Sequence, residues 1–157
     1  MTEPMYVSNV RIEGKAGHLP LIAHLPNEPD PVYFGLHGPL AKHFGVNEAE
    51  CEPHAATLDY IVASAAGCLI GTLGVMLAVR KVDVTNDRLS ADVRGEIELE
   101  DNVPVVRRIM VTYQITAPEG SKELIERVHG MHAKHCPVYR SLCKSIDITT
   151  DYKLTVG

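Results

Sequence analysis

The 157-residue sequence predicts an α+β fold, and we expect one domain over residues 1–157. Three observations support this class. Segments in which apolar and polar residues alternate occur near both ends of the chain, as is typical of half-buried strands. A segment without charge, 60–79, is long enough for a central helix. A second segment, 122–135, carries an apolar stripe at helical spacing and lies between predicted strands.

The first third of the chain is predicted to form three strands and a loop. "YVSNVRIEG" (6–14) and "HLPLIAHL" (18–25) alternate in polarity and are joined by a turn near Gly14 to Gly17. A short strand, "VYFGLHG" (32–38), follows the Pro-rich turn "PNEPDP". Residues 38–57 contain Gly, Pro, Asn and Glu, so we expect a long loop there, and loops of this length are usually functional or mobile.

The central predicted element is the helix over 60–79, where ten of twenty residues are Ala, Gly, Ser, Thr or Cys. Its length would span a bilayer. Because bulky residues are sparse and the flanking strands are amphipathic, we favour a helix that is buried on all sides in a soluble protein. Thr57 is the predicted N-cap, and the charge of Asp59 in the first turn suits the helix dipole.

The remaining sequence predicts a hairpin, two helices and a last strand. The hairpin turn is "DNVP", Ser121 can cap the longer helix, and a short helix begins at Pro137. Strands are predicted over 88–100, 105–115 and 145–156, and the longer helix over 122–135. Six strands from one subunit mostly cover one side of an apolar helix, so we expect a symmetric homodimer that shares its helical core.

Composition excludes several classes of protein. The net charge is −5, and the chain has no Trp, two Phe and no basic run, so we expect no nucleic-acid partner. The first nine residues do not resemble a signal peptide, so we expect a cytoplasmic protein that does not bind a membrane. The four Cys are too few and too scattered for a disulfide scaffold, which leaves reactive, metal-bound or buried thiols.

Cys136 stands directly before Pro137, a residue favoured at the first position of a helix. Cys136 is therefore a candidate N-cap, where the helix dipole and free backbone donors lower the pKa of a thiol. The alternative is a small apolar side chain at a turn. A reactive thiol needs a partner elsewhere in the chain.

Three motifs together resemble one known family. "ASAAGCL" around Cys68, "CPVYRSL" from Cys136 and the final "DITTDYKL" are similar to the OsmC/Ohr family, the osmotically inducible protein C and organic hydroperoxide resistance proteins. The resemblance runs from about residue 56 to the end. It implies antiparallel sheets around long central helices in an intertwined homodimer, with sites at the subunit interface and no cofactor.

The resemblance also implies a reaction. Active members are thiol peroxidases, in which the residue matching Cys68 attacks an organic hydroperoxide and becomes a sulfenic acid. The residue matching Cys136 condenses with it to a disulfide. A dithiol reductant, often a lipoyl protein, then restores both thiols. A nearby second thiol is what traps a sulfenic acid best.

The chain departs from the family beside the reactive cysteine. In the family an Arg, steadied by a Glu, assists that thiolate, but no Arg occurs between Arg11 and Arg80. His37 aligns roughly with the Arg, and Asp59 stands where relatives have Glu. An imidazole lacks the permanent charge and planar fork of Arg. The sequence thus leaves two hypotheses: a peroxidase, or a non-catalytic protein that binds a small apolar ligand or a thiol metabolite at its dimer interface.

Two histidine clusters and two further thiols remain. His129, His132 and His135 fan out around a helix, so they form either a solvated polar face or a metal site. A loop cluster of His43, Cys51 and His54 has no standard metal-ligand spacing. Cys51 lies beside two Glu and is expected to be unreactive. Cys143 follows Cys136 by one heptad, and it is either an alternative resolving thiol or a buried apolar one.

Overall fold

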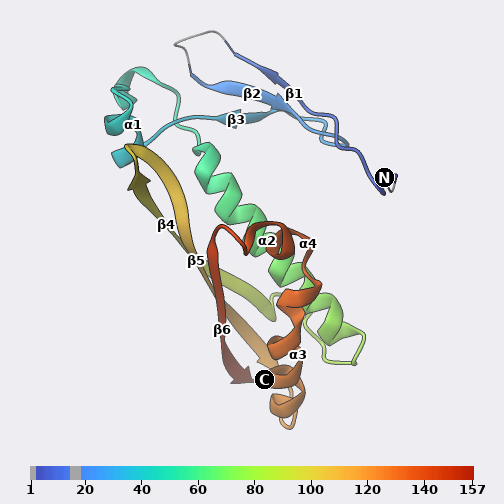
Figure 1. Ribbon diagram of the computed structural model, residues 1–157. Coiled ribbons are helices and arrows are strands. Elements are labelled where there is room, and N and C mark those ends of the chain that lie inside the picture. The colour runs from blue at the N-terminus through green and yellow to red at the C-terminus, as the bar shows by residue number, and fades with distance from the viewer. Residues whose placement is uncertain (1–2, 15–18) are drawn as a thin grey trace. The chain divides into compact units, whose positions relative to one another are not determined.

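The computed structural model describes residues 3–14 and 19–157, and it confirms the α+β class (Figure 1). The chain divides into two compact units, Met1–Thr57 and Leu58–Gly157, which are described separately. The single domain over residues 1–157 stays a prediction.

The first unit contains a three-stranded antiparallel sheet in the order β1-β2-β3. All three strands are predicted from the sequence but are shorter than expected. A strand ends where its neighbour no longer offers backbone hydrogen-bond partners. β2, for example, has four residues. The strands are β1 (Arg11–Glu13), β2 (Leu21–His24) and β3 (Val32–Phe34). The predicted turn between the first two falls largely on residues 15–18, outside the described residues.

The predicted loop over 38–57 is wrong in part, because it contains two short helices. These are α1 (Gly38–His43) and the 3₁₀ turn η1 (Glu48–Glu50). Pro39 stands in the first turn of α1, and the Asn47 side chain accepts a hydrogen bond from the backbone of Ala49 at 3.3 Å in η1. Both are helix-start signals that can be read from a sequence.

The second unit contains the long helix and a three-stranded sheet in the order β4-β5-β6. Helix α2 (Thr57–Ala78) begins at the predicted N-cap. The hairpin turn lies between β4 (Leu89–Glu100) and β5 (Val103–Ala117), with φ of 49° at Asp101 and 65° at Asn102. Two successive positive φ values match the twist of antiparallel strands, which explains the tight turn.

The last strand corrects the expectation of purely antiparallel sheets. β6 (Asp147–Val156) pairs with β5 in parallel, with Tyr113 opposite Tyr152. The chain between them forms α3 (Lys122–His132), the 3₁₀ turn η2 (Ala133–His135) and α4 (Pro137–Leu142). This helical crossover returns the chain to the end of the sheet where β5 starts, which makes the pair parallel.

Helix α2 packs on the sheet through one stripe of its surface. A Cβ atom at Gly95 of β4 would lie 2.5 Å from Val62 Cγ2, so Gly is required for this close approach. The helix residues buried in the core are Ala65, Ala66, Leu69, Leu73 and Leu77.

Burial of α2 on all sides is not found within one chain, because one sheet covers one side. Val75 and Val79 on this helix are 64% and 75% exposed. Within the described residues, α2 is the one helix whose length and mean hydropathy of 2.1 would suffice to cross a membrane.

Candidate active site

Cys68 lies in the middle of α2 and is half-buried. It packs against the core of the second unit, beside the fully buried Leu69. Its backbone carbonyl accepts a hydrogen bond from Thr72 Oγ1 at 2.8 Å. The helix therefore fixes the Cα position of Cys68 while part of its side chain stays open to solvent.

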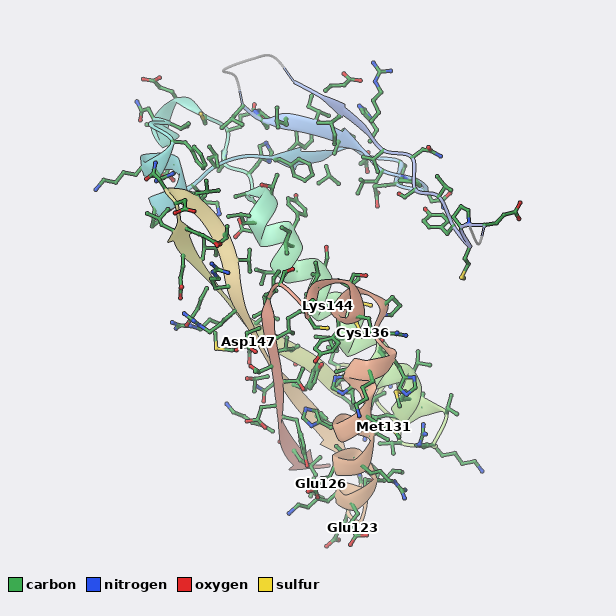
Figure 2. The ribbon with its side chains drawn as sticks, viewed as in Figure 1. Glu123, Glu126, Met131, Cys136, Lys144 and Asp147 are labelled. Carbon is green, nitrogen blue, oxygen red and sulfur yellow. The ribbon has the colours of Figure 1, made fainter. Side chains whose placement is uncertain are left out.

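Cys136 is fully buried where η2 meets α4 (Figure 2). It is the N-cap of α4, as predicted, and Pro137 follows at the first helical position. The backbone N–H of Tyr139 donates a hydrogen bond to Cys136 Sγ at 3.4 Å. This contact orients the sulfur toward the start of α4.

The fold brings Cys68 and Cys136 together, although 67 residues separate them in the sequence. Cys68 packs against the core that contains Cys136 and raises the pKa of the Cys136 thiol, and all four cysteines are free thiols. A disulfide requires two cysteines to lie close together. If one of the two thiols is oxidised to a sulfenic acid, the other can react with it to form a disulfide.

The pKa of Cys136 is raised, which overturns the expectation from its N-cap position. Burial is the main cause, and the neighbouring Cys68 raises the pKa further. The backbone N–H of Tyr139 opposes both effects, but a short helix does not offset complete burial. Cys136 is therefore a neutral thiol at physiological pH.

A buried polar group lies four residues before Cys136. His132 is fully buried, and its Nε2 lies 2.7 Å from the hydroxyl of Tyr113. Its Nδ1 lies 2.7 Å from the backbone oxygen of His129. Because a carbonyl only accepts, Nδ1 carries the proton, and the hydroxyl of Tyr113 donates to Nε2.

The solvated helix face predicted for the three histidines is wrong at His132. Its burial could have been read from the sequence, since it follows Ile125 by seven residues and Val128 by four, on the same face of α3. The ring of His129 stacks on that of His132 at 5.2 Å, whereas His135 is exposed. The three side chains do not converge.

Burial controls the protonation of this group. It lowers the pKa of His132 and of His129, and Asp151 opposes the effect at His129. It raises the pKa of Tyr113, and the nearby Cys136 raises it further. All three side chains are therefore neutral at pH 7.

A model of the family described as OsmC-like protein matches residues 53–151, which is more than half of the chain. The chain belongs to the OsmC-like protein family. The resemblance found in the sequence is thus confirmed. No curated protein matches the chain.

Solved structures share the fold of this OsmC-like protein at low sequence identity. An OsmC-like protein from Mycoplasma pneumoniae is 14% identical with a TM-score of 0.69, over 98% of this chain and 99% of that one. The organic hydroperoxide resistance protein OhrB of Bacillus subtilis is 12% identical with a TM-score of 0.63, over 96% and 100%. An OsmC-like protein of unknown function from Vibrio cholerae is 11% identical with a TM-score of 0.72, over 95% and 100%.

Asp59 lies in the second unit with the cysteine pair, whereas His37 lies in the first. Asp59 lies in the first turn of α2, nine residues before Cys68. At 1.5 Å and 100° per residue, that spacing places the two Cα atoms about 14 Å apart along the axis and half a turn apart around it. His37 precedes α1 in the first unit as its N-cap. Their roles stay predictions.

The other thiols of the OsmC-like protein lie apart from the pair. Cys143 ends α4 and is exposed, so its interpretation as a buried apolar thiol is wrong. Cys51 lines a cavity of about 330 Å³ in the first unit, together with His37 and His54. Among residues 3–14 and 19–157, no three His, Cys, Asp or Glu side chains are placed to hold a metal ion.

Proposed function

We propose that this OsmC-like protein is a cysteine-dependent peroxidase that reduces organic hydroperoxides. The proximity of Cys68 and Cys136 in the core of the second unit carries the proposal, because such a pair of thiols can trap a sulfenic acid as a disulfide. Relatives of the same fold named as organic hydroperoxide resistance proteins agree with it.

Different exposure supports different roles for the two thiols. Cys68 is half-buried and Cys136 is fully buried, so a hydroperoxide reaches Cys68 first. The Cys68 thiolate attacks one peroxide oxygen, the O–O bond breaks, and an alcohol leaves after protonation. Cys136 then attacks the sulfur of the Cys68 sulfenic acid, an S–S bond forms, and water leaves. An external dithiol, such as a lipoyl protein, reduces the disulfide.

The same proposal includes a cation beside Cys68 that stabilises its thiolate. His37 is the candidate for this cation, and Asp59 is the residue that orients it. Asp59 and Cys68 of one α2 helix face opposite sides, so a cation held by Asp59 cannot reach Cys68 on the same helix. We propose that Asp59 and His37 act on Cys68 of a second subunit. The homodimer is then required to complete the site.

We expect the protein to be a homodimer in sedimentation velocity at micromolar concentration. The reason is the exposed face of α2. A Cβ atom added at Gly67 or Gly71 would meet no other atom within 4 Å, and Val75 is 64% exposed. Val75→Glu places a charge on this face and is expected to shift the protein toward monomer. Val156→Glu, at a side chain that is 65% exposed on β6, is the matched control. A monomeric wild type contradicts the proposal.

The disulfide is the direct test of the function. Treating the reduced protein with one equivalent of cumene hydroperoxide is expected to give a peptide that links Cys68 to Cys136 in mass mapping. A disulfide between Cys136 and Cys143 instead would show that Cys136 does not resolve the sulfenic acid of Cys68. If Cys68 stays unoxidised at every pH, the peroxidase is excluded, and binding of a small apolar ligand or a thiol metabolite is the function left.

A further inference from the structure

The buried pair Tyr113–His132 has a geometry suited to moving a proton. In the described tautomer, the hydroxyl of Tyr113 donates to Nε2 of His132, and Nδ1 of His132 is held by the carbonyl of His129. The oxygen of Tyr113 retains lone pairs that can accept a second proton. A proton that reaches this oxygen can therefore be passed on to Nε2.

The chain fixes this pair close to the resolving thiol. Tyr113 and Cys136 are fully buried members of one hydrophobic core. The single 3₁₀ turn η2 joins His132 to Cys136, and the N–H of Cys136 donates to the carbonyl of Ala133 at 3.1 Å. The effect of Cys136 on the pKa of Tyr113 agrees with this proximity.

Cys136 needs a proton acceptor in order to react. The attacking species in disulfide formation is the thiolate. Burial and the neighbouring Cys68 raise the pKa of Cys136, so its thiolate is scarce at neutral pH. His132 is neutral under the same conditions, because burial lowers its pKa, and it can accept a proton.

We propose that Tyr113 and His132 form a proton relay that deprotonates Cys136 as it closes the disulfide with Cys68. This inference rests on the proposed function, since it assigns the second step of that reaction. The Cys136 thiol gives its proton to the oxygen of Tyr113, and Tyr113 gives its own proton to Nε2 of His132.

The electrons and atoms of this step balance. The sulfur of Cys136 forms a bond to the sulfur of Cys68 and is oxidised, while the S–O bond of the sulfenic acid breaks and the sulfur of Cys68 is reduced. Hydroxide leaves, and the relay runs back to deliver the proton that makes it water. Tyr113 and His132 are regenerated, and the hydroperoxide consumed in the first step is the oxidant.

Titratable groups on α2, α3 and β6 lie near the relay. His129 of α3 stacks on His132 and faces Tyr152 of β6, with 5.0 Å between these two ring centroids. Asp151 of β6 raises the pKa of His129, and Cys68 of α2 packs against the same core and raises the pKa of Cys136. Of these groups, only His132 accepts a hydrogen bond from Tyr113 in the described part of the chain.

Thiol exchange with an aromatic disulfide isolates the step from peroxide chemistry. In a Cys51→Ser, Cys143→Ser background, Cys68 takes one thionitrobenzoate group from 5,5′-dithiobis(2-nitrobenzoate). Cys136 then displaces a second coloured anion as the disulfide closes. The rate of this second release is measured from about pH 6 to about pH 9, the range in which the neutral imidazole of His132 can accept a proton while the thiol of Cys136 stays largely protonated. His132→Gln keeps a polar side chain but cannot accept the proton.

We expect closure in His132→Gln to be about 100-fold slower than in the parent at pH 7, the usual size of general-base assistance. Its rate should rise about tenfold per pH unit, because it follows the thiolate fraction of Cys136. The parent should vary far less over this range. Tyr113→Phe should behave as His132→Gln does. His135→Gln, at an exposed imidazole beside Cys136, is the matched control and should close as the parent does.

Equal rates and equal pH profiles in His132→Gln and His135→Gln would overturn the relay. Slowing by the same factor at every pH would overturn it too, because that pattern marks packing alone. If His132→Gln fails to fold by circular dichroism, Tyr113→Phe decides, since it removes one oxygen atom. Failure of hydroperoxide to oxidise Cys68 contradicts the proposed function, and it leaves the result of the exchange assay unchanged.

Discussion

Replacing Cys68 with Ser is expected to lower the turnover of cumene hydroperoxide on the order of 1,000-fold or more. A serine hydroxyl is not ionised at neutral pH and cannot replace a thiolate as the nucleophile. The protein should stay folded, because Ser is close to Cys in size and Cys68 is only half-buried. Turnover is measured as peroxide loss in the presence of excess dihydrolipoamide.

Two further variants separate the roles of the thiols when the reductant is left out. One equivalent of hydroperoxide should leave Cys136→Ser with a Cys68 sulfenic acid that dimedone labels, because that sulfenic acid has no internal partner. Cys143→Ser is the matched control at an exposed thiol and should form the Cys68–Cys136 disulfide without dimedone labelling, as the wild type does. An unlabelled Cys136→Ser with a disulfide to Cys143 would move the resolving role to Cys143.

Much of the fold could be predicted because its signals are local. The turn at Asp101 and Asn102, the Pro that follows Cys136 and the uncharged segment of α2 each specify their own conformation. The parallel pairing of β5 with β6 could not be read in this way. It depends on how the helices between these strands pack on the sheet, and strand periodicity is the same in both pairings.

The cysteine pair could be found from sequence motifs, whereas the hydrogen bond behind it could not. Helical spacing to Ile125 and Val128 indicates that His132 is buried, but only the position of Tyr113 on β5 determines the bond that this imidazole makes. The raised pKa of Cys136 has the same origin, since burial is a property of the folded core. Local sequence correctly predicted its N-cap geometry and wrongly predicted its acidity.

The cation proposed beside Cys68 could not be placed from one helix. Asp59 and Cys68 are on opposite sides of α2, so the family motifs indicate both residues although the helix does not bring them together. The open face of the same helix explains this separation if a second α2 helix packs there. The dimer and the completed site are thus one hypothesis, and Val75→Glu should weaken both association and peroxide turnover.

Acid is expected to destabilise the fold through the same buried histidines. Burial lowers the pKa of His132 and His129 in the folded state, whereas both titrate near pH 6.5 in an unfolded chain. Below about pH 6.5 the unfolded chain therefore binds more protons than the native state. The free energy of unfolding should be independent of these groups above that pH, and it should fall as the pH drops toward their folded pKa values.

For the fully buried His132, the loss between pH 6.5 and pH 5.5 should reach at most about 1 kcal/mol, since one proton taken up on unfolding gives a limiting slope of about 1.4 kcal/mol per pH unit. The measurement is urea denaturation at the two pH values and at one fixed protein concentration, because association would shift the midpoint. His132→Gln should lose less stability over this interval than wild type, even though its stability at pH 7.5 is lower.

His135→Gln removes an exposed imidazole and should keep the wild-type loss. A loss in His132→Gln as large as that in wild type would mean that burial does not lower the pKa of His132, which contradicts the buried neutral imidazole on which the relay depends.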